Sequence, residues 1–341
     1  EAKMKTNHPL LTAAILLAAF AEGVGYGSIL PQSPVRSPGE ALPKPAQTEA
    51  ATPASAADHR AEAPAASSWT RGPKTVLFMR VNFPDDQAEP ISEAEALALM
   101  NQVNLFFTEN SYGATSFSTT VTRLLTLPQP KTWYMQEAKP GLVLEHARIV
   151  AAEAGYRPAD YDLDCVDFVR LFPVRDSWGY TAMKGTMLQA NDVGLTCHEF
   201  GHNLGLSHAN AWQTTDRSAI GPGANLEYGN VFDTMGRGES ERWHFNTCFK
   251  NLLGWLPASA IQTVTTNGLY RLYPSDVPEL DSGRKYALRL KKDFAREYWI
   301  ETRRQLNANP RWKQSLLLNW APWGGSANGT QILAADPTSP D

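Results

Sequence analysis

Three histidines and one glutamate are closely spaced in the segment CHEFGHNLGLSH, residues 197–208. His198 and His202 are four positions apart, and residues at this spacing lie on one face of an α-helix, one turn apart. Two imidazoles on one helical face can bind the same zinc ion. Glu199 follows the first histidine, so its carboxylate can take a proton from a metal-bound water without being a ligand itself. The pattern predicts a helix that carries two metal ligands and a general base.

A third histidine, His208, lies ten positions after His198. It could not reach the same ion if the helix continued, because its height along the axis and its direction would both be wrong. Gly205 permits the positive φ of a helix C-terminal turn, after which the chain can bring His208 back toward the metal. Three neutral imidazoles leave the fourth position of tetrahedral zinc to water, as in catalytic sites. Zinc lowers the pKa of such a water to about 7, so the sequence predicts hydrolysis.

The full spacing H-E-x-x-H-x-x-G-x-x-H is far more specific than H-E-x-x-H alone. It is expected by chance in about one of 10⁴ chains of this length, so a helix with merely structural histidines is the minor alternative. The extended motif is that of the metzincin zinc peptidases, whose second mark is a turn that carries a methionine. Met235, in the segment YGNVFDTMG, is the candidate. Taken alone, a methionine between Thr and Gly is better explained as an ordinary core residue, and it is the histidine motif that makes it a candidate.

Six segments between residues 75 and 335 together resemble the gametolysin (autolysin) family of secreted zinc endopeptidases: VLFMRVNFPD, ENSYGATSF, HEFGHNLGLSHAN, YGNVFDTMG, HFNTCFKNLLGWL and EYWIETRR. The resemblance implies a metzincin-like catalytic domain with a mixed sheet and an active-site helix, followed by a β domain. It implies an endopeptidase that cleaves extracellular or cell-wall proteins, including glycoproteins. It also implies that YTAMKGTML forms the edge strand on which an extended peptide binds. By the same resemblance, the functional residues are the zinc ligands His198, His202 and His208, the base Glu199 and the Met-turn residue Met235.

Strand and helix patterns surround the zinc motif. Residues 75–83 form a β-rich apolar run that ends at a Pro-Asp-Asp turn, which predicts a buried strand. Ser92 and Glu95 form a capping box before a helix that ends near residues 111–113. Further strands are predicted over 115–127, 165–173 and 179–188, and a further helix over 141–155. This mixture indicates an α+β or α/β domain, and the resemblance favours the α+β class.

The chain divides into four predicted segments. Residues 1–21 have a basic start, an apolar run and an Ala-x-Ala site, which together predict a signal peptide and a secreted protein, extracellular or periplasmic. Residues 22–72 are rich in Ala, Pro, Ser and Glu, as in a disordered linker or a prosegment, and both interpretations stay open. Residues 73–257 form the predicted catalytic domain. Strand-like runs over 258–341 predict a smaller β-sandwich-like domain, which by the resemblance is truncated.

Composition limits the partners. A formal net charge of −4, from 31 basic and 35 acidic side chains, provides no basic surface for nucleic acid or an anionic membrane. The apolar run of the signal peptide has about half of the ~20 residues that span a bilayer, so no membrane anchor is expected. The expected partner is a protein or peptide substrate, and the oligomeric state stays open. The alternative is a non-catalytic, secreted, zinc-containing binding protein of the same fold, which would have no need of Glu199.

Other candidate residues carry weaker signals. With three cysteines, at most one internal disulfide can form, and the sequence does not choose a pair among Cys165, Cys197 and Cys248. A calcium ion could bind a cluster of three acidic residues, but a turn and a strand entrance are the favoured interpretation. These residues are Asp162, Asp164 and Asp167. His244 is expected to have a helix-cap or core role.

Overall fold

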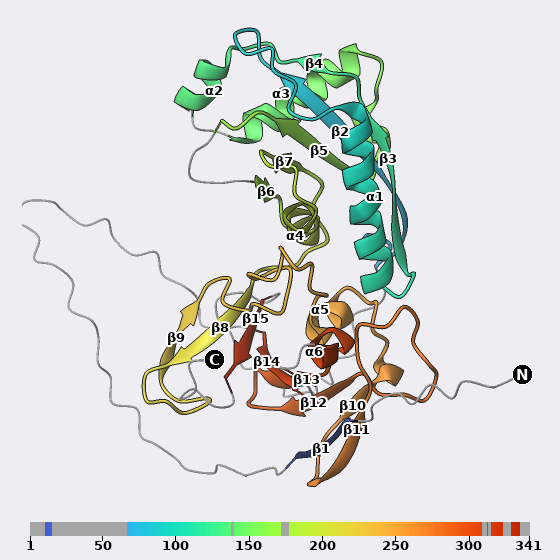
Figure 1. The fold of residues 1–341 in the computed structure, drawn as a ribbon, viewed down its shortest axis with the longest axis vertical. Helices are drawn as coiled ribbons and strands as arrows, with labels where there is room; N and C mark the ends of the chain where they lie inside the picture. The colour runs from blue at the N-terminus through green and yellow to red at the C-terminus, as the bar shows by residue number, and fades with distance from the viewer. Residues whose placement is uncertain are drawn as a thin grey trace, which may run out of the picture.

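The computed structural model describes residues 11–15, 67–137, 140–171, 177–308, 312, 315–322 and 329–334. Most of the predicted signal peptide and most of the segment 22–72 lie outside these residues. The described part is a mixed structure of two mixed sheets and a few helices, compatible with the predicted α+β class. Figure 1 shows an upper half and a lower half, with the helix that carries the histidine motif between them.

The upper half is built on a six-stranded sheet with the order β3-β2-β5-β7-β6 and with β4 paired to the end of β2. All its strands are parallel except β6, which is antiparallel to β7 at the edge. The strands are β2 (Gly72–Asn82), β3 (Thr115–Val121), β4 (Leu125–Thr126), β5 (Leu163–Phe168), β6 (Ser177–Gly179) and β7 (Thr186–Leu188).

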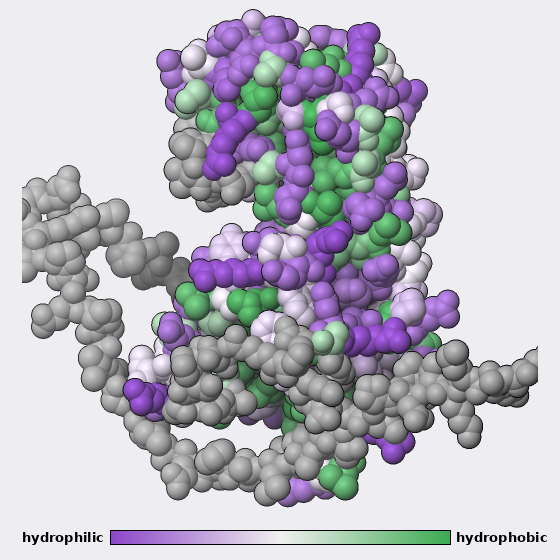
Figure 2. All heavy atoms as spheres, in the orientation of Figure 1, coloured by the Kyte–Doolittle hydropathy of each residue, from purple (hydrophilic) through white to green (hydrophobic). Residues whose placement is uncertain are grey.

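Helices cover both faces of this sheet. Val76 and Phe78 of β2 pack in one core cluster with α1 (Glu93–Asn110) and α4 (Val193–Asn203). Leu77 and Met79 pack in a second cluster, on the other face, with α2 (Lys131–Glu137) and α3 (Pro140–Glu153). Because both faces are buried, β2 carries four consecutive apolar residues at 76–79, as is typical of strands in parallel sheets. Most large apolar residues of these strands and helices therefore lie inside, and Figure 2 shows hydrophilic side chains on the upper half together with smaller apolar areas.

Local signals predicted the start of α1. The Ser92 hydroxyl accepts a hydrogen bond from the Glu95 amide at 3.3 Å, and the Glu95 carboxylate accepts one from the Ser92 amide at 3.0 Å. This confirms the predicted capping box, which satisfies two amides that the helix itself leaves unpaired. The helix ends at Asn110, directly before the predicted stop.

One strand prediction was wrong in a way that affects the site. The segment 179–188 is not a single strand, because the chain reverses between β6 and β7. Ala182 and Gly185 have φ values of 58° and 137°, which turn the backbone, and the Tyr180 amide donates to the Gly185 carbonyl at 2.9 Å. The edge strand is consequently the short β6, which ends before residue 180, the first residue of the segment YTAMKGTML that was expected to form it. The predicted strand over 115–127 is also interrupted, between β3 and β4.

The lower half contains a seven-stranded sheet with the order β10-β12-β13-β14-β15-β8-β9. Two of its strands, β8 and β9, precede residue 258, and β15 pairs in parallel with β8, so that Thr330 lies opposite Ala209. The sheet thus joins the segment after the zinc motif to the C-terminal part of the chain. The strands are β8 (Ala209–Thr214), β9 (Gly223–Leu226), β10 (Ile261–Thr263), β12 (Ala287–Lys291), β13 (Glu297–Glu301), β14 (Leu317–Ala321) and β15 (Thr330–Leu333).

Smaller elements complete the lower half. A two-stranded antiparallel ribbon pairs β11 (Gly268–Leu272) with β1 (Leu11–Ile15), a segment of the predicted signal peptide. Two short helices, α5 (Thr247–Leu252) and α6 (Arg304–Ala308), lie beside the large sheet (Figure 1). No helix in the described ranges is both long and apolar enough to cross a membrane.

A buried polar cluster connects the lower sheet to the loop before Met235. The guanidinium of Arg303, with no exposed surface, donates to the Glu301 carboxylate at 2.7 Å and to the Phe232 carbonyl. Lys250 is also fully buried, and its ammonium lies 3.1 Å from Nδ1 of His244. Burial lowers the pKa of Lys250 to about 7. His244 is half-buried and contacts this cluster through Lys250.

Candidate metal centre

Helix α4 is capped at its start by Asp192, and it ends before Gly205, as the histidine motif predicts. At its start, the Asp192 carboxylate accepts a hydrogen bond from the Leu195 amide at 2.8 Å, which caps the helix. At its end, Gly205 has a φ of 107°, and the Leu206 amide donates to the Gly201 carbonyl at 3.1 Å. A residue with a side chain would be strained at this φ. The helix therefore stops at Asn203, one residue after the second histidine, and the chain turns back.

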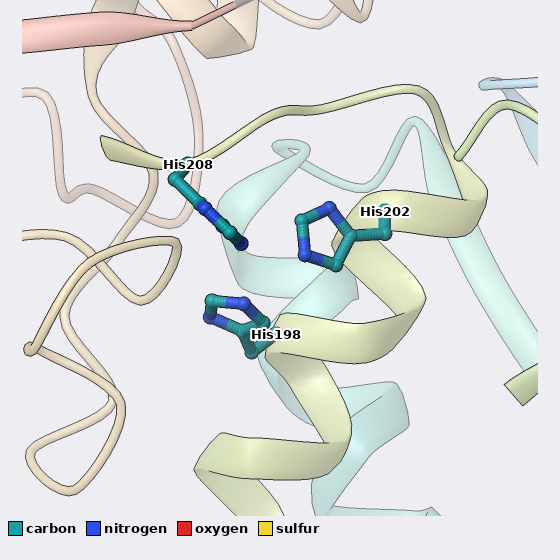
Figure 3. Close-up of side chains that lie close together, drawn as sticks. All are labelled: His198, His202 and His208. Carbon is teal, nitrogen blue, oxygen red and sulfur yellow. The ribbon is translucent and has the colours of Figure 1, made fainter. Parts of the chain in front are cut away.

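The three imidazoles come together beside α4. His198 and His202 lie one turn apart on the helix, and His208 reaches them from the segment that leads into β8 (Figure 3). One ring nitrogen from each residue lies within 4.8 Å of the other two. In the part of the chain that the structure describes, no other three His, Cys, Asp or Glu residues form such a group. The cluster is thus the candidate metal centre.

Each imidazole is oriented by a hydrogen bond at its Nδ1 atom. Nδ1 of His198 lies 2.8 Å from the Thr234 carbonyl, and Nδ1 of His202 lies 2.8 Å from the Leu206 carbonyl. Nδ1 of His208 lies 2.7 Å from the Glu227 carboxylate. Because these oxygens only accept, each Nδ1 carries the proton and each Nε2 keeps its lone pair. This is the tautomer in which a histidine ligates a metal through Nε2.

Burial keeps the two helical imidazoles neutral. Loss of hydration lowers the pKa of His198 to about 3, and that of His202 to about 4, with a smaller contribution from the neighbouring histidines. Both rings are uncharged at neutral pH, and the neutral ring is the form that ligates metals. Three imidazole nitrogens that face one point match the ligand preference of zinc, with a position left for water. The residues present therefore fit a zinc ion.

Glu199 is buried on α4, directly after His198. The strand β6 runs close to this part of the helix: a Cβ added at Gly179 would lie 2.4 Å from the Glu199 carbonyl oxygen. Only glycine permits this approach. The edge strand of the upper sheet therefore lies beside the turn of α4 that carries the candidate base.

Met235 lies against α4 at Gly201. A Cβ added at Gly201 would lie 2.4 Å from the Met235 sulfur, so the glycine of the motif makes room for the methionine. The Asp233 carboxylate accepts the Met235 amide at 2.8 Å, and the Met235 carbonyl accepts the Ala209 amide at 2.9 Å. The turn around Met235 thus supports both the helix and the start of β8, next to the third histidine.

Two further residues contact the third histidine and were not predicted from the sequence. Glu227 hydrogen-bonds His208 from 19 positions away, and the ring centroid of Tyr228 lies 4.0 Å from that of His208. No spacing rule connects a glutamate and a tyrosine to a histidine at this separation. Their only sequence signal is a carboxylate and an aromatic residue shortly before the methionine turn.

The acidic residues considered for calcium do not converge. Asp162 accepts hydrogen bonds from the amide and hydroxyl of Thr75 at 2.8 and 3.0 Å. Asp164 makes a two-bond ion pair with Arg148, at 2.8 and 2.7 Å. Asp167 is buried elsewhere on β5. The three carboxylates lie in different surroundings within the protein, which agrees with the interpretation as a turn and a strand entrance. All three cysteines are free thiols.

Asp167 is expected to make stability depend on pH. Burial raises the pKa of its carboxyl from 3.8 to about 8, and one of its oxygens has no hydrogen-bond partner among the described residues. The folded protein therefore holds a proton that the unfolded chain releases above about pH 4. The contribution of this proton to the free energy of unfolding is lost as the pH rises from about 4 to about 8, by up to about 1.4 kcal/mol per pH unit.

Asp167→Asn should flatten this dependence. Urea unfolding at pH 5, 6 and 7 is expected to show a smaller loss of unfolding free energy for the variant than for the wild type. Asp162→Asn is the matched control, because hydrogen bonds from Thr75 lower the pKa of Asp162 and place its titration below this range. Identical slopes for the wild type and Asp167→Asn would show that Asp167 is ionised in the folded protein.

No family model and no curated protein matches the chain. Among the solved structures that match is one described as the structure of a chaperone-substrate complex, at 15% sequence identity and a TM-score of 0.27. The match covers 41% of this chain and 27% of that chain, so it spans about a quarter of the other protein's length. A likeness at this TM-score supports no conclusion about fold or function.

Proposed function

We propose that the protein is a secreted zinc-dependent endopeptidase of the gametolysin type, with a metzincin-like catalytic domain. The observation that carries this proposal is the cluster of His198, His202 and His208 with Glu199 on the same helix. Three neutral nitrogen donors are the ligand set of catalytic zinc sites. The methionine turn against α4 and the edge strand β6 beside it support the same fold.

The chemistry follows from these residues. Zinc held by the three imidazoles would supply Lewis-acid activation of a water molecule and of the peptide carbonyl. Glu199 accepts the proton of the attacking water and passes it to the nitrogen that leaves when the C–N bond breaks. Each histidine keeps its Nδ1 proton in a hydrogen bond, to the carbonyl of Thr234, the carbonyl of Leu206 or the carboxylate of Glu227. The histidines therefore do not take part in proton transfer.

The edge strand indicates how a substrate is held. In the described residues, β6 is the last strand of its sheet and lies against α4 at Glu199. An extended peptide can add to such an edge through main-chain hydrogen bonds, which favours unfolded or extended segments of protein substrates. Extracellular or cell-wall proteins are the proposed substrates, and the signal-like residues 1–21 support secretion.

Cleavage of casein by the purified protein tests the proposal. With about one equivalent of zinc per chain, the protein is expected to cleave casein; a chelator should stop the reaction, and added zinc should restore it. Zinc bound at the three histidines without cleavage of casein or of a peptide library would favour the non-catalytic binding protein. Cleavage that survives complete removal of the metal would exclude a zinc peptidase.

A further inference from the structure

The residue that packs on the third histidine has an unusual backbone conformation. Tyr228 has a φ of 58°, and it is the third residue of a turn in which the Gly229 amide donates to the Leu226 carbonyl at 3.1 Å. Glycine or asparagine is the usual residue at a left-handed position of this kind. A bulky aromatic ring there is strained, and such strain persists where the surrounding structure or the function requires the side chain.

The turn is tied to the strand that follows His208. The side chain of Asn210, which is 2% exposed, accepts a hydrogen bond from the Tyr228 amide at 2.9 Å. Gly229 lies against the same strand, since a Cβ at this position would be 2.6 Å from the Cβ of Ala211. The position of Glu227 and Tyr228 relative to His208 is therefore fixed through β8.

Both side chains of this turn act on one histidine. The Glu227 carboxylate lies 2.7 Å from Nδ1 of His208, while the Tyr228 ring lies over the His208 imidazole at 4.0 Å between centroids. The same tyrosine ring is 5.9 Å from that of His198. The side chain of His208 is 21% exposed and follows the end of α4, so no helix orients it.

We propose that Glu227 and Tyr228 form a clamp that orients His208 for metal binding, and that this clamp sets the metal affinity of the site. The carboxylate holds the proton on Nδ1, and the ring restricts rotation of the imidazole. Outer partners of this kind typically contribute 10- to 100-fold to metal affinity. The backbone strain at Tyr228 is then explained, because glycine or asparagine would relieve it but would leave His208 uncovered. The inference rests on the proposed zinc site.

Tyr228→Asn separates this role from a merely structural one. Asparagine accepts the left-handed backbone but lacks the ring. The metal-free variant is expected to melt at or above the wild-type temperature, while its zinc affinity, measured by competition with a chromophoric chelator, falls about 10- to 100-fold. Tyr228→Phe keeps the ring and should bind zinc like the wild type. A wild-type zinc affinity for Tyr228→Asn, or a loss matched by a lower melting temperature of the metal-free protein, would overturn the clamp.

Glu227→Ala tests the other half of the clamp in the same titration. We expect a loss of zinc affinity of about 10- to 100-fold, without a change in melting temperature, because the Glu227 side chain is 62% exposed. Glu279→Ala, at another exposed glutamate, is the matched control and should bind zinc normally. If wild-type protein binds no zinc, the proposed function fails together with the clamp. If wild type binds zinc and the clamp variants bind it equally tightly, only the clamp is wrong.

Discussion

Glu199→Gln is expected to reduce the rate of casein cleavage by at least about 10⁴-fold while zinc stays bound. A general base typically contributes ~10² to 10⁴ in rate, and this one also positions the attacking water, so the upper end is expected. Glutamine has nearly the same shape as glutamate but cannot accept the proton. Since Glu199 is buried on α4, this substitution disturbs the packing less than alanine would. The three histidines are unchanged, so the metal should remain.

Three measurements on the same preparations decide the role of Glu199: zinc content, thermal melting and cleavage rate, each for wild type and variant. Loss of cleavage with zinc and melting temperature retained would assign the base. A variant that holds zinc, melts normally and cleaves at a rate near that of the wild type would mean that another residue is the base. Loss of zinc from the variant would instead indicate that Glu199 helps to hold the metal.

Local features of the sequence predicted the elements that carry the site. The spacing of His198 and His202 depends only on helix geometry, and the end of α4 depends on the backbone freedom of Gly205, which has a φ of 107°. The capping box before α1 likewise involves two residues that are only three positions apart. Such signals operate within one or two turns, so they can be interpreted without knowledge of the rest of the molecule.

Contacts between distant segments could not be predicted in this way. The pairing of β15 with β8 joins Thr330 to Ala209, and no local pattern encodes which strands become neighbours. The reversal between β6 and β7 was not predicted, because apolar residues on both sides of the turn have the pattern of one continuous strand. Glu227 was missed for the related reason that its role comes from its position opposite His208 in the folded chain. The sequence thus predicted that the three histidines come together, but not which groups orient them.

His202→Ala is expected to remove most of the bound zinc, from about one ion per chain in the wild type. His202 is one of only three protein donors in the cluster, and its loss leaves two. Because outer partners of metal ligands already contribute 10- to 100-fold, loss of a ligand itself should weaken binding further than that. Zinc that binds only the folded state stabilises by about 2.7 kcal/mol at a free concentration 100 times its Kd. Added zinc should consequently raise the melting temperature of the wild type but not of the variant.

His146→Ala is the control, since His146 lies on α3 and hydrogen-bonds Tyr134 on the far face of the upper sheet. Elemental analysis of the three proteins after dialysis gives the answer, and unchanged zinc in His202→Ala would rule out the ligand assignment.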